Sequence, residues 1–337
     1  MLGFYDLQGR KDLPWQLNKT DYSVWVSEIM LQQTQVKTVI PYYLRFMQSF
    51  KSVEALADAH IDDVLKHWEG LGYYSRARNL HACAKQVVTQ FNSRFPQTLT
   101  EIISLPGIGE STGGAILSLA YRLPEAILDG NVKRVLARVF LVDGWYGNAK
   151  VSQELWKISR KYTPNKRTGD FNQAMMDLGA GICNRSNPQC EICPLTKHCE
   201  AKQKNLTKEY PHRKQKKAIP MKEVTMLLDA KGSKILLHKR PPSGIWGGLW
   251  SLPEQTNLSH QSNQKSIKIT GQFKHTFSHY HLKATVISPS KNQQKNYQIE
   301  DNSELAWHNV NELTKLALPT PIKKFLYKHF AIKEERL

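Results

Sequence analysis

Four of the five cysteines in this chain lie close together, in the stretch CNRSNPQCEICPLTKHC. They are Cys183, Cys190, Cys193 and Cys199, with the spacing C-x6-C-x2-C-x5-C. Thiolates at this density are typical of one compact metal centre. Structural zinc sites with four cysteines usually carry two C-x2-C pairs across a longer gap, whereas this stretch has one such pair. The spacing therefore favours a [4Fe–4S] cluster over zinc, with unligated thiols as a third possibility.

The charge balance indicates what this chain binds. Its formal net charge is +18 over 337 residues. Such an excess favours a polyanion, because each phosphate contact releases counterions and adds affinity. We expect nucleic acid rather than a membrane, since no basic amphipathic helix with a wide apolar face stands out. No membrane-length apolar run and no signal-peptide layout occur, so a bacterial cytoplasmic location with reduced thiols is expected.

The hydrophobic pattern changes along the chain. Apolar residues recur every three to four positions from about Tyr22 to Asp177, which predicts helices. The segment after Cys199 is polar and basic, and from Glu223 the pattern is that of strands, closed by a helix near residues 319–334. We predict an all-α domain over 1–203 that contains the cysteine loop, a basic linker over 204–222, and a smaller α+β domain over 223–337.

The stretch LPGIGESTGGAILSLA contains a glycine turn at Gly107 and Gly109. It does not fit a dinucleotide-binding fingerprint, because a helical segment precedes it and the third glycine is misplaced. The turn instead joins two helices and exposes backbone N–H groups at the second helix's N-terminus, where a phosphate can bind. An ordinary helix–helix turn explains this stretch equally well.

Two carboxylates stand in contrasting contexts. Glu28 interrupts a strongly apolar helical stretch, where burial raises the pKa of a carboxyl group, although a structural acid is also possible. Asp129 stands where a helix should begin, so the helix N-terminus favours its charged form, and it can simply be an N-cap. Cleavage of a glycosidic bond needs this pairing, with one group to protonate the leaving group and one to stabilise an oxocarbenium ion.

The cysteine loop is similar to that of the endonuclease III superfamily of DNA glycosylases, and LPGIG resembles its helix-hairpin-helix. With SEIMLQQTQV, GLGYYSRARNL, ILDGNVKRVLARV and FNQAMMDLGA, the chain resembles the adenine DNA glycosylases of the MutY family over nearly its whole length. The resemblance implies a base-excision repair enzyme that acts as a monomer. Its substrate would be duplex DNA with adenine opposite 8-oxoguanine or guanine.

The same resemblance implies the roles of individual residues. Glu28 would protonate N7 of an extruded adenine, Asp129 would stabilise the cation at C1′, and Asn131 would lie in the same pocket. Leu31 and Gln33 would wedge into the duplex. The residues expected to contact DNA or the lesion are Leu31, Gln33, Tyr73, Gly107, Gly109, Ser111, Phe277, Ser278 and His279. The four clustered cysteines would hold the [4Fe–4S] cluster.

Two alternatives differ in class. An endonuclease III-like lyase on oxidised pyrimidines needs a lysine two residues after the hairpin's second glycine, where this chain has Ser111. A hydroxyl cannot form the imine that lyase chemistry requires, so a monofunctional glycosylase is favoured. A non-catalytic iron–sulfur DNA-binding protein would show the same loop and charge, but Glu28 and Asp129 in matching contexts argue against it.

The C-terminal part resembles a Nudix hydrolase at KRPPSGIWGGLWSLPE. It lacks the Glu-rich motif that would hold magnesium, so we expect no nucleotide hydrolysis. Within HTFSHYH, Phe277, Ser278 and His279 read as part of a half-buried strand. Their resemblance to a family loop instead implies a turn that reads 8-oxoguanine opposite the adenine.

Overall fold

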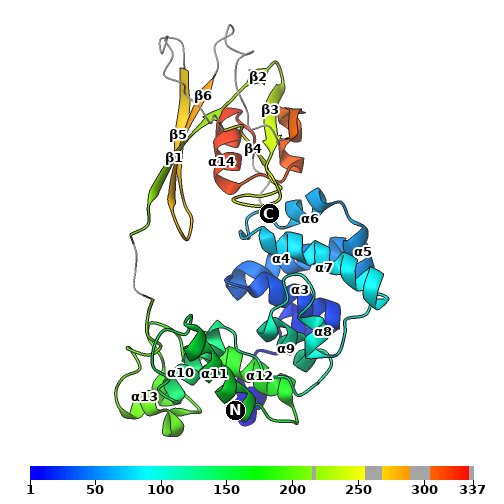
Figure 1. The fold of residues 1–337 in the computed structure, drawn as a ribbon. Coiled ribbons are helices and arrows are strands. Elements are labelled where there is room, and N and C mark those ends of the chain that lie inside the picture. Colours follow the sequence, from blue (N-terminus) through cyan, green and yellow to red (C-terminus); the bar gives the residue numbers. More distant parts are fainter. Residues whose placement is uncertain (215–217, 255–267, 289–303, 334–337) are drawn as a thin grey trace. The chain divides into compact units, whose positions relative to one another are not determined.

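The computed structural model describes residues 1–214, 218–254, 268–288 and 304–333. The chain forms two compact units, one of Met1–Asp58 with Asn79–Lys216 and one of Ala59–Arg78 with Lys217–Leu337. The first unit is helical and the second contains both strands and helices (Figure 1). These units are defined by packing, whereas the ranges 1–203, 204–222 and 223–337 divide the chain by position and stay a prediction.

The helices follow the predicted apolar periodicity. They are α1 (Leu2–Gln8), α2 (Pro14–Leu17), α3 (Asp21–Leu31), α4 (Val36–Ser49), α5 (Val53–Asp58), α6 (Ile61–His67), α7 (Ser75–Phe91), α8 (Leu99–Ile102), α9 (Glu110–Leu119), α10 (Gly130–Val139), α11 (Ala149–Tyr162), α12 (Thr168–Asp177) and α13 (Glu200–Gln203). Three further short helical segments lie before and within the cysteine stretch: η1 (Leu178–Ile182), η2 (Cys190–Ile192) and η3 (Thr196–His198). α6 and the start of α7 lie in the second unit.

The core of the first unit forms around α3 and α9. Trp25, Val26 and Met30 of α3 are fully buried, so this helix is enclosed on most sides. α9 packs against both α3 and α12. A Cβ at Gly114 would lie 2.2 Å from the carbonyl oxygen of Ala126, so glycine lets α9 approach the segment that leads into α10. The packing of α3, α9 and the start of α10 thereby brings three functional segments together.

Two sheets make up the strand-containing part of the second unit. In one, β1 (Met221–Leu227) pairs in parallel with β6 (His281–Ser288), which pairs antiparallel with β5 (Lys268–Thr276). In the other, β3 (Lys234–Lys239) lies between β2 (Ala230–Lys231) and β4 (Trp250–Ser251) on one edge and β7 (Glu304–Asn309) on the other, all antiparallel. The turn η5 (Val310–Lys315) and α14 (Thr320–His329) follow. The predicted α+β domain is confirmed.

Candidate active site and DNA interface

Glu28 is a half-buried carboxylic acid on a helix whose other side chains are mostly buried. α3 begins with a capping box in which Thr20 and Ser23 satisfy each other's backbone N–H groups, and this fixes where the helix starts. Burial, followed by repulsion from Asp129, raises the pKa of Glu28 to about 8. The side chain is therefore largely protonated at neutral pH. The expected rise in this pKa is found.

Asp129 accepts hydrogen bonds on both carboxyl oxygens at the start of α10. One of its oxygens accepts a 2.8 Å hydrogen bond from the Val132 N–H, which makes it the N-cap. The other accepts from the Asn131 side-chain amide at 3.0 Å. The Leu128 N–H donates to Ser111 Oγ at 2.9 Å, which ties the residue before Asp129 to α9. Helices α3, α9 and α10 thus bring Glu28, Ser111, Asp129 and Asn131 into one site.

A network that the sequence analysis missed holds Asn131 in place. Arg134 donates to Asn131 Oδ1 at 2.9 Å, to the Gly179 carbonyl at 2.5 Å and to the Cys183 carbonyl at 2.8 Å. A Cβ at Gly179 would lie 2.5 Å from Asn131 Cβ, so only glycine allows this approach. The available signal was spacing, since Asn131, Arg134 and Arg138 recur along one face of α10.

The predicted hairpin turn joins α8 to α9. Gly107 adopts φ +79°, and a Cβ there would also lie 2.8 Å from Asn79 Cβ, so two constraints favour glycine. Gly109 is the N-cap of α9 and provides no side-chain hydrogen bond to the helix, while a Cβ on it would meet nothing within 4 Å. The first N–H groups of α9 are thus approachable, as phosphate binding requires.

The loop after α3 lies beside this hairpin. Where the sequence suggested continuous helical periodicity, the chain leaves the helix at Gln32, and Gln33 adopts φ +58° before α4 begins. Gln32 donates to Thr112 Oγ1 on α9 at 3.4 Å. Leu31 is half-buried and Gln33 exposed. The two expected wedge residues are therefore the neighbours of Gln32, which contacts the helix that follows the hairpin.

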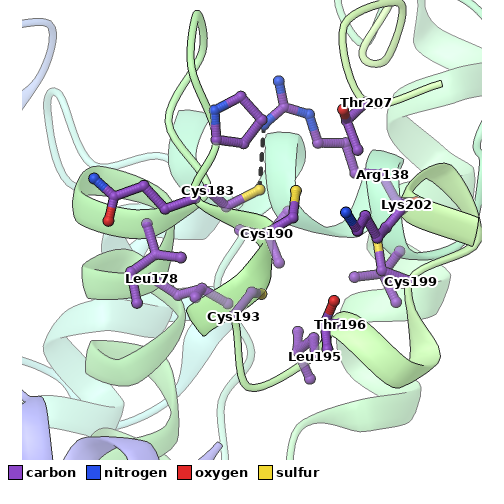
Figure 2. A pocket seen from close by; sticks show the side chains of 15 residues that line it. Arg138, Leu178, Cys183, Cys190, Cys193, Leu195, Thr196, Cys199, Lys202 and Thr207 are labelled. Atoms are coloured by element: carbon purple, nitrogen blue, oxygen red, sulfur yellow. Dashed lines mark hydrogen bonds between the residues drawn. The ribbon is translucent and has the colours of Figure 1, made fainter. Parts of the chain in front are cut away.

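The four clustered cysteines line one cavity, together with apolar side chains that include Leu178 and Leu195 (Figure 2). Burial raises the pKa of the Cys190, Cys193 and Cys199 thiols, to about 11 for Cys193. Within the described residues, no three His, Cys, Asp or Glu side chains are grouped for one metal ion. The donor set facing this cavity is four thiols, which is the set that an iron–sulfur cube takes, with one thiolate at each iron.

Arg138 ties this cavity to α10. The residue is 2% exposed. Its guanidinium donates to Cys183 Sγ at 3.3 Å (Figure 2). It also donates to the Asn184 carbonyl at 2.7 Å and to the Arg185 carbonyl at 3.2 Å. It also donates to the Tyr210 carbonyl at 2.8 Å. A single buried cation thus fixes both the start of the cysteine loop and the chain that follows it.

The other predicted contact residues belong to the second unit. Tyr73 has a 50% exposed side chain, adopts φ +50°, and lies against the Arg76 guanidinium. Residues 277–280 form the turn between β5 and β6, as the family resemblance implied, closed by a 2.9 Å hydrogen bond from the Phe277 N–H to the Tyr280 carbonyl. Ser278 and His279 are exposed at its tip, with 3.3 Å between Ser278 Oγ and His279 Nδ1.

Two family models match the chain. Residues 26–161 match the HhH-GPD superfamily base excision DNA repair proteins, and residues 224–328 match the NUDIX domain. A solved thermostable thymine-DNA glycosylase aligns with a TM-score of 0.53 and 28% identity, over 60% of this chain and 93% of its own. The fold is that of a base-excision DNA glycosylase that carries a C-terminal Nudix domain.

Curated relatives narrow this class. The adenine DNA glycosylase of Buchnera aphidicola subsp. Baizongia pistaciae is 42% identical, over 97% of this chain and 95% of its own length. The adenine DNA glycosylase of Homo sapiens is 34% identical, over 84% of this chain and 64% of its own length. The chain belongs to the adenine DNA glycosylase family. No helix in the described residues is both long and apolar enough to cross a membrane.

Proposed function

We propose that this protein removes adenine mispaired with 8-oxoguanine or guanine in duplex DNA, by hydrolysing the N-glycosidic bond without cutting the strand. The observation that carries the proposal is the contrast between Glu28 and Asp129. The pKa of Glu28 is raised to about 8, whereas Asp129 accepts hydrogen bonds on both oxygens. Departure of a base requires an acid that holds its proton and, beside it, a second carboxyl group positioned to face the cation that forms.

In the proposed mechanism, Glu28 donates its proton to N7 of an adenine turned out of the helix. The bond between N9 and C1′ then breaks, its electron pair leaves with the protonated base, and positive charge develops at C1′. Asp129 stabilises that charge, with Asn131 holding the carboxylate in place. A water adds to C1′, its proton passes to the Glu28 carboxylate, and an abasic site remains.

The identity of residue 111 supports monofunctional chemistry. Ser111 Oγ already accepts a hydrogen bond from the Leu128 N–H, and a hydroxyl cannot form the imine of a lyase. Borohydride should therefore trap little or no covalent enzyme–DNA adduct. Efficient trapping together with strand scission would place the protein among the lyases instead.

We further propose that Cys183, Cys190, Cys193 and Cys199 hold a [4Fe–4S] cluster that shapes the loop for contact with DNA. The shared cavity and the four thiols support it. When bound, the cluster supplies a rigid cross-link between the turns of the loop and favours the thiolate form of its ligands. Purified protein should be brown and contain about four irons per chain, whereas one zinc in a colourless preparation would overturn the assignment.

We propose the DNA contact of each residue from its place in the structure. Gly107 and Gly109 would present backbone N–H groups to a phosphate, and Leu31 and Gln33 would enter the base stack beside them. Tyr73 and the turn with Phe277, Ser278 and His279 would meet the base opposite the adenine. Action as a monomer in a bacterial cytoplasm stays an expectation from the sequence.

The deciding experiment is incubation with duplexes that carry adenine opposite 8-oxoguanine, guanine or thymine, followed by alkali to reveal abasic sites. We expect cleavage after alkali for the first two and little for the third. Glu28→Gln, which keeps the shape and removes the donated proton, should lower the rate by about 100-fold or more. A Glu28→Gln enzyme that excises adenine at the normal rate would contradict the proposal.

A further inference from the structure

A short helical segment of the chain packs with the strand-containing unit rather than with its sequence neighbours. Residues Ala59–Arg78, here called the docked segment, belong to the same compact unit as Lys217–Leu337. The docked segment includes α6 and carries Tyr73. Asp62 of α6 forms a 2.8 Å ion pair with Lys239 of β3, with both side chains one-third exposed or less.

Glu69 is the centre of a second set of attachments. Its side chain is 9% exposed, accepts a hydrogen bond from Lys66 Nζ at 2.7 Å and forms an ion pair with Lys323 Nζ of α14 at 3.5 Å. It also accepts from the Leu318 backbone N–H at 3.4 Å. Lys66 donates to the Leu316 carbonyl at 2.9 Å as well. One shielded carboxylate thus links the docked segment to α14 and to the chain that precedes it.

Arg78 attaches the docked segment at its other end. Arg78 Nη1 donates to the Gly247 carbonyl at 2.6 Å. A Cβ built on Gly248 would lie 3.1 Å from a Leu65 methyl group, so the two segments of the chain are in close contact. Gly247 and Gly248 belong to the loop between β3 and β4, residues 240–249, here called the bracket loop. Arg78 therefore joins the docked segment to this loop.

The bracket loop also holds the turn between β5 and β6. The Trp246 ring lies 5.4 Å from the Phe277 ring and 5.8 Å from the His275 ring, centroid to centroid. Gly247 cannot carry a side chain without movement, because a Cβ there would lie 2.6 Å from the Pro242 carbonyl oxygen. A continuous path of contacts therefore runs from Arg78 through Gly247 and Trp246 to Phe277.

We propose that Arg78 and Glu69 are positioning residues for recognition of the base opposite the adenine. They fasten Tyr73 to the bracket loop and to the turn with Ser278, so that both recognition elements are held in one body. The inference rests on the proposed function, in which both elements meet the same base. Contacts to one small ligand from parts of the chain about 200 residues apart work only if their spacing is fixed to a fraction of an ångström.

The test uses Arg78→Met, which keeps the apolar stem, and Glu69→Gln, which keeps the shape. Single-turnover excision opposite 8-oxoguanine should fall by roughly tenfold in each variant, because misplaced contacts lose their effect. Excision opposite guanine should change by less than about twofold, since the turn recognises the 8-oxo group. Arg78→Lys should restore part of the preference. Lys85→Met, on the exposed face of the same helix, is the matched control and should leave both rates unchanged.

Coupling separates positioning from direct contact. In a Ser278→Ala background, Arg78→Met should cost little more, because the contact that it positions is already gone. Additive losses, equal losses on both substrates, or a smaller salt dependence of binding for every duplex would overturn the proposal. Hydrogen exchange in full-length protein tests the fastening without substrate. Residues 59–78 and 240–249 should exchange faster in both variants but not in Lys85→Met. This result does not depend on lesion preference, so a wild-type protein without preference for 8-oxoguanine would count against the proposed function alone.

Discussion

Glu28 and Asp129 differ in what surrounds their carboxyl groups, and this difference makes the rate depend on pH. Glu28 must hold its proton to act as the acid, and its pKa is raised to about 8 by burial and by Asp129. We therefore expect the single-turnover rate of adenine excision to fall as the pH rises through about 8. A rate that stays level from pH 7 to pH 9 under single-turnover conditions would show that Glu28 is not the proton donor.

The same pKa predicts a cost in stability. Between the ordinary value of 4.5 and about 8, folded Glu28 keeps a proton that the unfolded chain has released, so stability falls as the pH rises through that window. Glu28→Gln removes this loss. We expect the Tm of the variant to rise relative to wild type between about pH 5 and pH 8, in thermal melts at fixed ionic strength. A constant difference in Tm across this range would contradict the raised pKa.

Gly179 sets the position of Asn131 because it has no side chain, which lets the two residues approach closely. A Cβ at Gly179 would lie 2.5 Å from Asn131 Cβ, whereas one at Gly181 would meet nothing within 4 Å. Gly179→Ala should lower the single-turnover rate by about tenfold or more, because Asn131 and the Asp129 carboxylate that it holds must shift. Gly181→Ala, in the same turn of η1, is the matched control and should leave the rate unchanged.

At the scale of elements, the turn between β5 and β6 is built to present two polar side chains. Phe277 packs against Trp246 and Tyr280, while Ser278 and His279 stay exposed. A hydroxyl can accept a hydrogen bond from the N7–H of 8-oxoguanine, a group that guanine lacks. Ser278→Ala with His279→Ala should therefore cost roughly 1–3 kcal/mol of preference for 8-oxoguanine. Excision opposite guanine should largely survive, and equal losses would instead assign the turn to folding or general DNA binding.

Local signals carried much of the prediction from sequence. The apolar periodicity of α3, the N-cap at Asp129 and the glycine turn before α9 depend on neighbours in sequence, and the structure places each as expected. The packing of the docked segment could not be predicted in this way, because its attachment joins Arg78 to a carbonyl 169 residues further on. The role of Gly179 was hidden for the same reason, since its constraint comes from a different helix.

At the scale of the whole molecule, positive charge and chain path combine in the stretch that follows the cysteine loop. Arg213 and Lys214 lie in the described part of it, with Lys214 Nζ 5.1 Å from the Trp145 ring centre. Lys216 and Lys217, which continue this basic stretch, lie outside the described residues. Arg138, which lines the cysteine cavity, donates a hydrogen bond to the Tyr210 carbonyl just before this stretch. The start of the basic stretch is therefore held beside the cavity.

This placement predicts a contact with the DNA backbone that does not depend on the DNA sequence or on the lesion. Replacing Arg213, Lys214, Lys216 and Lys217 with Gln should weaken binding to all duplexes about equally. The slope of log K against log salt should become shallower by as much as about 3.6, since each of the four lost phosphate contacts accounts for about 0.9. The variant in which exposed Lys51, Lys85, Lys324 and Lys328 become Gln removes the same net charge and is the control. If both sets change the slope equally, long-range attraction explains the effect. If the linker set lowers affinity only for duplexes that contain 8-oxoguanine, these residues recognise the lesion and do not serve as backbone contacts.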